Sequence, residues 1–149
     1  RQPTYLGCSI SEGFKNYSYF HDWCQRQIGF GQEDFQLDKD FLIKGSKIYS
    51  EDTCLFLPRE LNALMNYYRA RRENLPLGIT TQNGRFRAQC YRGKSVSRHL
   101  GYFDTPELAF QAYKQAKEAF IKRQAEKWKN FIDPRAYEAL MRYEVLITD

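Results

Sequence analysis

Hydrophobic and polar positions alternate along residues 85–91. Phe86, Ala88 and Cys90 take every second place, and the places between them hold Arg85, Arg87, Gln89 and Tyr91. Successive side chains of a strand point to opposite faces of its sheet. The alternation therefore predicts a strand with one apolar face and one arginine-rich face.

Turn signals on both sides of this stretch predict two neighbouring strands. Asn83-Gly84 is typical of a two-residue hairpin turn, and the polar stretch 92–95 predicts a second turn before a strand over 96–103. Thr105-Pro106 predicts the start of a helix, because threonine caps the first amides and proline suits the first helical position. One face of this helix carries Leu108, Ala109, Ala112, Tyr113, Ala116 and Phe120. The alanines would let the helix lie close on a small sheet.

The first half of the chain mixes helical and extended patterns. Apolar spacing predicts helices over 9–28 and 58–72, the second with Pro58 in its first turn. Shorter apolar runs predict extended segments over 35–43 and 54–57, and Asp133-Pro134 predicts the start of a final helix. The whole pattern predicts an α+β protein: a small ββα unit, then a three-stranded antiparallel sheet packed on a helix, then a C-terminal helix.

The change from helical spacing to alternation falls at 73–76. The 149 residues allow one ordinary domain or two small ones. We therefore predict a first unit over 1–74, a second over 75–127 and a C-terminal extension over 128–149. The chain begins with arginine, not methionine, so we also expect the first unit to lack an N-terminal segment.

Charge is distributed unevenly between the two halves. The net charge is +5, yet residues 1–74 hold ten basic and ten acidic side chains. The excess lies after residue 74, and the stretch 75–103 contains no aspartate or glutamate. An acid-free basic stretch is typical of a polyanion partner, the alternative being an ordinary solvated surface.

Two further sequence features exclude some classes of protein. No run of eighteen apolar residues occurs, which predicts a protein without a membrane span. The cysteines at 8, 24, 54 and 90 lack the spacing of a zinc site, so we expect reduced, buried thiols.

Residues 75–125 resemble the plant ethylene-response-factor (apetala-two) type DNA-binding domain. The resemblance is carried, in order, by Leu77-Gly78-Ile79, Arg85-Phe86-Arg87-Ala88, Lys94, Leu100-Gly101-Tyr102-Phe103-Asp104-Thr105, Glu107, Ala109, Ala112-Tyr113 and Ala116. It implies a three-stranded sheet that enters the major groove and a supporting helix behind it. The tryptophan positions of the plant domain have no obvious counterpart here.

The upstream part resembles phage HNH-type, homing-like endonucleases that carry this same DNA-binding domain. The residues that carry this resemblance are Leu37-Asp38-Lys39-Asp40, Ile48-Tyr49-Ser50, Thr53-Cys54-Leu55-Phe56, Pro58 and Leu61-Asn62. It implies a ββα nuclease site in which a histidine activates water and an acidic residue helps to hold Mg²⁺ or another divalent metal.

Carried over by position, this nuclease motif is degenerate. Asp38 and Asp40 flank the site, Lys39 stands where the base histidine is expected, and Asn62 stands where the helical metal ligand is expected, with Asn66 one turn later. A lysine serves as a base only when its pKa is strongly lowered, whereas acids on both sides should raise it. Either Asp38, Asp40 and Asn62 bind a metal that activates water, or the site is inactive and its residues are structural.

The remaining basic residues extend the expected DNA-binding set. The three arginines at the end of the predicted helix 58–72 would contact the DNA backbone or, alternatively, only favour the helix dipole. The full set is Arg69, Arg71, Arg72, Arg85, Arg87, Gln89, Arg92, Lys94 and Arg98. Of the two histidines, His21 is expected on a helix, while strand parity leaves His99 on either face of the sheet.

The function expected from these residues is binding of double-stranded DNA with metal-dependent cleavage. The alternatives are a catalytically inactive DNA-binding protein and a phage protein that inhibits a protein partner. The resemblance implies the cytoplasm of a phage-infected bacterial cell. The sequence leaves the DNA target and the oligomeric state open.

Overall fold

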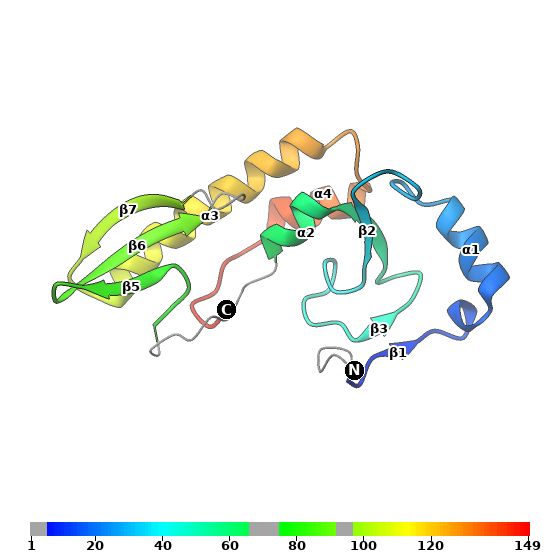
Figure 1. The fold of residues 1–149 in the computed structure, drawn as a ribbon, viewed down its shortest axis with the longest axis horizontal. Helices are drawn as coiled ribbons and strands as arrows, with labels where there is room; N and C mark the ends of the chain where they lie inside the picture. Colours follow the sequence, from blue (N-terminus) through cyan, green and yellow to red (C-terminus); the bar gives the residue numbers. More distant parts are fainter. Residues whose placement is uncertain (1–5, 66–74, 92–96) are drawn as a thin grey trace.

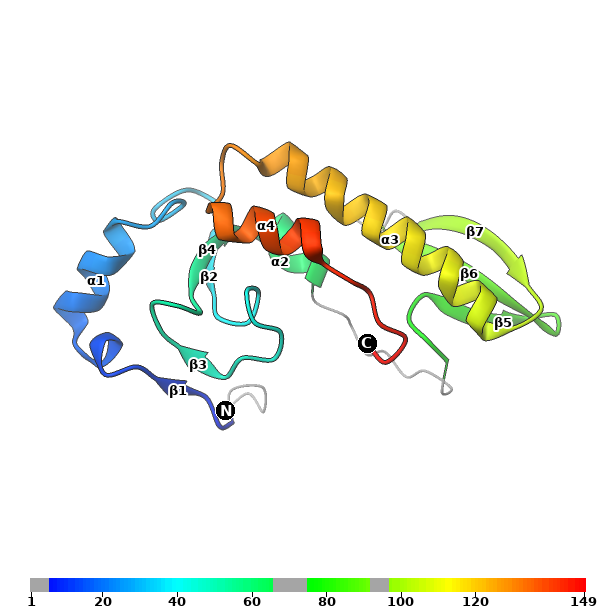
Figure 2. The same cartoon turned by 180° about the vertical axis from the view of Figure 1, so that it is seen from behind.

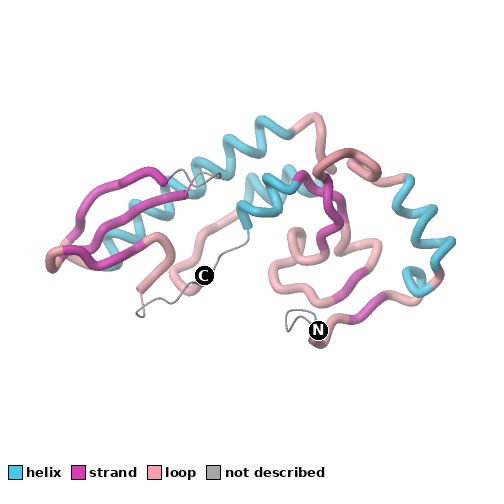
Figure 3. Tube along the Cα trace, in the orientation of Figure 1, coloured by secondary structure: helices cyan, strands magenta, loops and turns pink. Residues whose placement is uncertain are grey.

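The computed structural model describes residues 6–65, 75–91 and 97–149. The described residues form an α+β protein, drawn in Figures 1 and 3. Its first half contains β1 (Ser9–Ile10), a 3-10 helix η2 (Gly13–Lys15), α1 (Tyr17–Gln25), β2 (Phe35–Asp38), β3 (Ile48–Tyr49), β4 (Leu55–Pro58) and α2 (Arg59–Met65). Its second half contains β5 (Ile79–Gln82), β6 (Arg85–Tyr91), β7 (Ser97–Phe103), α3 (Pro106–Trp128) and α4 (Pro134–Arg142).

The strands form three separate sheets among the described residues. β1 pairs with β3 in parallel, β2 pairs with β4 antiparallel, and β5, β6 and β7 form an antiparallel sheet with β6 in the centre. The chain enters α2 directly from β4, so β2, β4 and α2 make a compact ββα arrangement. The predicted α+β class, with its three-stranded sheet, supporting helix and C-terminal helix, is confirmed.

Two local features shape the three-stranded sheet. Asn83 and Gly84 both have positive φ, 51° and 75°, which is the conformation of a two-residue hairpin turn whose twist matches the strands it joins. Gly78 also has a positive φ, and a Cβ there would lie 2.3 Å from the ring of Tyr113. A glycine is therefore needed where the start of β5 approaches α3.

The predicted alternation of β6 is confirmed. Ala88 and Cys90 are fully buried, and Phe86 packs against the same apolar cluster. This cluster also contains Ala109, Phe110 and Tyr113 from the first half of α3. Figures 1 and 2 show the sheet and α3 as two layers, with the helix covering one sheet face.

Helix α3 begins at the predicted residues and continues into a second core. The Thr105 hydroxyl accepts a hydrogen bond from the Leu108 amide at 3.2 Å, and Pro106 occupies the first turn. The second half of α3 packs on the first half of the chain. The shared core there contains Phe41, Leu55, Leu57, Leu61, Leu64, Phe120, Ile121, Ala125, Ile132, Ala136 and Leu140. One helix therefore supports both halves.

Helix α4 completes the shared core beside α2 (Figure 2). The Asp133 carboxylate caps it by accepting from the Arg135 amide at 2.8 Å. The Arg135 guanidinium then donates to the carbonyl oxygens of Glu51 and Cys54 at 3.5 and 3.4 Å. The predicted start at Asp133-Pro134 is confirmed, and α4 is tied to the loop before β4.

The predicted helix over 9–28 is wrong at its start. Residues 9–10 form β1, since the Ser9 amide donates to the Lys47 carbonyl at 2.8 Å, and the α-helix starts only at Tyr17. The Asn16 side chain accepts from the Tyr19 amide and so caps α1 there. The apolar spacing that suggested a longer helix did not reveal this pairing with a distant strand.

Pro58 also differs from its predicted place. It ends β4, where it pairs with Phe35, and α2 begins at Arg59. Of the predicted helix 58–72, the structure describes residues up to 65. The boundary at 73–74 lies outside the described residues, and the division into units at 74 and 127 stays a prediction.

The cysteines are free thiols. Cys24, Cys54 and Cys90 are buried, as predicted, whereas Cys8 is partly exposed.

No helix in the described part of the chain combines the length and the apolar character that a membrane crossing needs.

Candidate functional site

The three-stranded sheet presents a polar face on the side away from α3, which we call the outward face. Strand pairing places Thr80 and Gln82 of β5 beside Arg87 and Arg85 of β6. On the other side, Arg87 pairs with Tyr102 and Gln89 pairs with His99 of β7. The outward face thus carries Thr80, Gln82, Arg85, Arg87, Gln89, Tyr91, His99 and Tyr102.

The strand register resolves the orientation of His99. A β-bulge interrupts the pairing between Ala88 and Gln89, so that Ala88 pairs with Gly101 while Gln89 pairs with His99. His99 therefore stands in the outward row beside the arginines. Strand parity alone does not decide which face His99 occupies, because the bulge shifts the register by one residue and parity does not reveal it.

Arg85 lies at the hairpin end of the outward face. Its guanidinium donates to the Asp104 carboxylate at 3.2 Å and to the Tyr102 carbonyl at 3.3 Å. Both charged side chains of the pair are largely exposed. Exposed ion pairs contribute little to stability, so a phosphate could replace Asp104 at small cost.

Arg87 lies in the middle of the outward face and has a different partner. Its Nε donates to Nδ1 of His99 at 3.4 Å. The His99 ring packs on the Tyr102 ring, with centroids 4.9 Å apart, and the Tyr102 hydroxyl donates to Oε1 of Gln82 at 3.1 Å. These contacts link all three strands and hold the Arg87 side chain along the sheet surface.

Not every expected DNA contact lies on the outward face. Arg98 pairs with Cys90, whose side chain is buried under α3, so Arg98 belongs to the row on the helix side although it is exposed. Five of the expected contacts lie outside the described residues: Arg69, Arg71, Arg72, Arg92 and Lys94.

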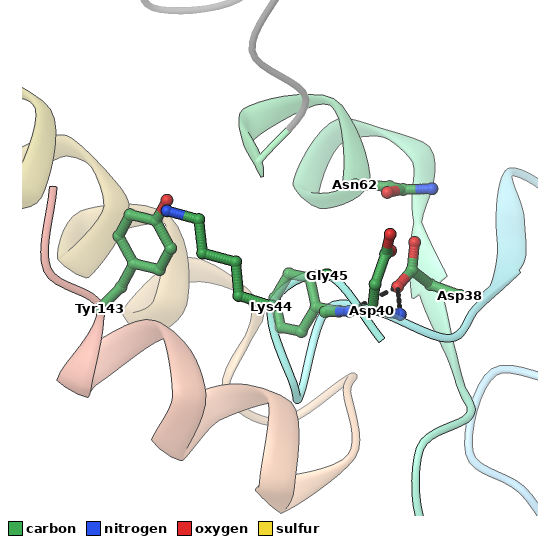
Figure 4. A pocket seen from close by; sticks show the side chains of 7 residues that line it. Asp38, Asp40, Lys44, Gly45, Asn62 and Tyr143 are labelled. Carbon is green, nitrogen blue, oxygen red and sulfur yellow. Dashed lines mark hydrogen bonds between the residues drawn. The ribbon is translucent and has the colours of Figure 1, made fainter. Parts of the chain in front are cut away.

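A second polar site lies in the first half of the chain. Asp38, Asp40 and Asn62 line a small pocket of about 100 Å³, which we call the carboxylate pocket. It brings together three of the four residues expected at a nuclease site. Figure 4 shows their side chains gathered at one end of the pocket. The remaining lining residues are Phe41, Lys44, Gly45 and Tyr143. Asn66 lies outside the described residues.

Local hydrogen bonds explain how this pocket forms. Oδ1 of Asp38 accepts from the amides of Asp40 and Phe41 at 2.9 and 2.7 Å, which turns the chain sharply at the end of β2. The turn brings the Asp40 carboxylate back beside Asp38 (Figure 4). Asn62 joins them because β4 pairs with β2 and leads straight into α2.

The two carboxylates give the pocket a concentrated negative charge. Burial raises the pKa of Asp38 above its ordinary value, and the neighbouring Asp40 charge raises it further. The two backbone hydrogen bonds act in the opposite direction but do not cancel these effects. A divalent cation bound here would relieve the repulsion between the two carboxylates.

The donor atoms of the pocket fit a hard divalent cation. Two carboxylates and one amide supply oxygen ligands, and Mg²⁺ is commonly held by one or two carboxylates with water and phosphate completing its shell. The pocket volume leaves room for a few water molecules. Within the described ranges, no group of three or more histidine, cysteine, aspartate or glutamate side chains is placed to hold a metal, so Asn62 would have to complete the set.

Lys39 does not share the pocket with its neighbours. Its ammonium group contacts the Asp40 carboxylate at 3.2 Å and lies 5.7 Å from the centre of the Tyr49 ring. Burial alone would lower the pKa of Lys39, but the hydrogen bond and the charge of Asp40 outweigh it and raise the pKa. The lysine thus stays protonated at neutral pH and is unsuited to act as a general base.

Sequence reasoning missed two residues of the pocket. Lys44 follows β2 at the far side of the pocket, and Tyr143 comes from the segment after α4. The Lys44 ammonium group pairs with the Asp149 carboxylate and lies 6.0 Å from the centre of the Tyr143 ring. In Figure 4 it points away from Asp38 and Asp40. No local motif links residue 44 to residue 143, because only the folded core brings them together.

His21 is not part of either site. Its ring stacks on Tyr17 of the same helix at 6.1 Å and meets the edge of Phe30 at 6.3 Å. It does not line the carboxylate pocket. The expectation of an ordinary helix histidine agrees with these contacts.

Comparisons with known proteins give no relative for this chain. No family model, no curated protein and no solved structure matches it.

Proposed function

We propose that this protein binds double-stranded DNA through the outward face of its three-stranded sheet. The observation that carries the proposal is the row formed by Arg85, Arg87 and Gln89 on the central strand, on a face opposite the helix. The stretch 75–103 that contributes this row contains no acidic residue. A rigid surface with arginine forks and an amide matches the donors and acceptors of the major groove.

The packing of the sheet suits it to this role. The major groove admits a β-ribbon, and in the described part of the chain the supporting helix α3 packs on the face opposite the outward one. Arginine pairs with guanine edges or phosphates, and glutamine pairs with adenine. The resemblance of residues 75–125 to the ethylene-response-factor type domain supports the same partner.

Fluorescence anisotropy with a labelled DNA duplex tests this proposal. We expect the double substitution Arg85→Ala and Arg87→Ala to weaken binding and to flatten its dependence on salt, because each lost phosphate contact lowers the slope of log K against log salt by about 0.9. Arg142→Ala, which removes an exposed cation on α4, is the matched control. Equal effects of the double variant and the control would rule out the outward face.

A second activity, DNA cleavage with Mg²⁺ or another divalent metal, is favoured by the pocket that Asp38, Asp40 and Asn62 share. A metal bound there would lower the pKa of a water molecule and so supply a nucleophile. The two carboxylates would hold the cation, and the Asn62 amide would orient it. Lys39, which stays charged, would act only through its ion pair with Asp40.

Plasmid nicking in Mg²⁺ or Mn²⁺ tests this second activity. Asp38→Asn is the sharpest variant, because an asparagine oxygen can still accept the two amides that form the turn. Cleavage by the wild type that this variant loses would support the pocket as the site. DNA binding without cleavage would favour the alternative, a catalytically inactive DNA-binding protein; absence of both would favour a protein-inhibiting role.

The phage HNH-type resemblance supplies the proposed setting. This proposed setting is the cytoplasm of a phage-infected bacterial cell, with DNA as the proposed partner.

A further inference from the structure

A chain of side-chain contacts links the three strands across the outward face. It runs from Arg87 on β6 through His99 and Tyr102 on β7 and returns to Gln82 on β5. The contact at Arg87 has a defined direction, because its Nε is a donor and Nδ1 of His99 must accept. A histidine accepts at Nδ1 only when that nitrogen carries no proton.

We propose that His99 is a positioning residue for Arg87 and that protonation of His99 releases this arginine. The inference rests on the proposed binding of DNA by the outward face. With His99 neutral, the Arg87 side chain is held in place, so less side-chain entropy is lost when it pairs with a base edge. With His99 protonated, the acceptor is gone and two cations lie side by side.

The groups that face His99 directly come from its own strand and from β6. From β6 it faces Arg87 and the neutral Gln89, and on its own strand it packs against Tyr102. From β5, Gln82 reaches this row through the Tyr102 hydroxyl. The Asp104 carboxylate lies at the hairpin end of the sheet, where it pairs with Arg85. Helix α3 lies behind the sheet, on the opposite face.

Release of Arg87 changes how DNA is bound. A released arginine and an imidazolium both favour phosphates, whose attraction does not depend on sequence. Binding at acid pH should therefore be more sensitive to salt and less selective. An imidazole can take up a proton in mildly acidic solution, in which DNA duplexes remain stable.

The test compares DNA binding at about pH 8 and about pH 5.5 over a series of salt concentrations. For the wild type, we expect the slope of log K against log salt to steepen at the lower pH by about 0.9 for each phosphate contact that is gained. His99→Gln keeps an acceptor for Arg87 but cannot be protonated, so its slope should stay the same at both pH values. His21→Gln, at the other histidine, should behave as the wild type.

A second measurement does not need DNA. In ¹⁵N–¹H spectra of the protein alone, the Arg87 Nε–H signal, assigned by its loss in Arg87→Lys, should lose protection as the pH falls. The same signal should be insensitive to pH in His99→Gln. His99→Phe keeps a ring packed on Tyr102 but offers no acceptor to Arg87. The Arg87 Nε–H signal of this variant should therefore be unprotected at both pH values.

The possible results separate this inference from the proposed function. Binding that weakens in Arg87→Ala but has the same salt slope at both pH values overturns the role of His99 and leaves DNA binding intact. A pH-dependent slope that persists in His99→Gln also overturns it. A wild type without DNA affinity at any salt concentration overturns the proposed function, and with it this inference.

Discussion

The outward face of the sheet and the carboxylate pocket are both polar, but they are built in opposite ways. The outward face comes from three strands that follow one another in the chain, and its arginines lie on the face opposite α3. The pocket comes from β2, α2 and the segment after α4, and its two carboxylates are crowded together. A surface needs only correct strand register, whereas a pocket needs the whole core.

This difference determines what each site can tolerate. Arg85 and Arg87 lie on a supported sheet whose core is on the far side, so replacing them should leave the fold unchanged. Asp38 both forms a turn and contributes charge to the pocket. Its substitution must therefore separate these two roles.

The largest effect is expected from the shared core. Ile121→Ala removes a fully buried side chain of α3 that packs between the two halves, and such changes cost about 2–5 kcal/mol. Urea unfolding followed by circular dichroism measures this loss. Leu108→Ala, which changes a half-exposed residue of the same helix, should cost less than about 0.5 kcal/mol. Similar costs for both would contradict the dual packing of α3.

The second effect concerns affinity alone. Arg87→Ala should weaken DNA binding by about 1–3 kcal/mol, or roughly 5–150-fold, because one forked contact is lost. The free energy of unfolding should stay within about 0.5 kcal/mol of the wild type. Anisotropy titration and urea unfolding of the same preparation measure both. A variant that lost stability and affinity together would show that the outward face also holds the fold.

The third effect concerns the support behind the sheet. Thr105→Ala removes the hydroxyl that caps α3 and should lower the free energy of unfolding by about 0.5–2 kcal/mol. Thr105→Ser restores an oxygen at the same place and should recover most of the loss. Thermal unfolding of the two variants checks this pair. If serine and alanine behave alike, the hydroxyl is not what stabilises the start of the helix.

The smallest effect is a pH dependence in the pocket. The folded protein raises the pKa of Asp38, so it binds this proton more tightly than the unfolded chain does. Tighter binding of this proton adds to the free energy of unfolding. This contribution is fully present below the pKa of the unfolded chain, about 3.9, and is lost as the pH rises through the higher pKa of the folded protein. Asp38→Asn, which never ionises, should therefore gain stability relative to the wild type between acid and neutral pH. Parallel unfolding curves at several pH values measure the difference, and an opposite trend would contradict a crowded carboxylate.

The sequence predicted what depends on local periodicity and missed what depends on distant contacts. The alternation of Phe86, Ala88 and Cys90 predicted the buried face correctly, and with it the outward position of Arg85 and Arg87. It could not orient His99, since the bulge before Gln89 shifts the register. The same bulge places Arg98 on the helix side.

The carboxylate pocket shows the same limit. Asp38, Asp40 and Asn62 match positions of the nuclease motif that the sequence resembles, and they do lie together. Lys44 and Tyr143 could not be selected, because residues about a hundred positions apart meet only after α4 docks. The acids around Lys39 were expected to raise its pKa, and Asp40 does so through a direct ion pair.

The position of α3 in both cores has a consequence for synthesis of the protein. The apolar sides of β4 and α2, with Leu55 and Leu61, are covered by Ile121 and Leu140. A ribosome makes these partners only after β5, β6 and β7, so until then the first half waits with its apolar surface uncovered. Such nascent chains are prone to aggregation and bind chaperones. A slow step in translation between α2 and α4 should therefore harm the yield of this protein more than a slow step before β4.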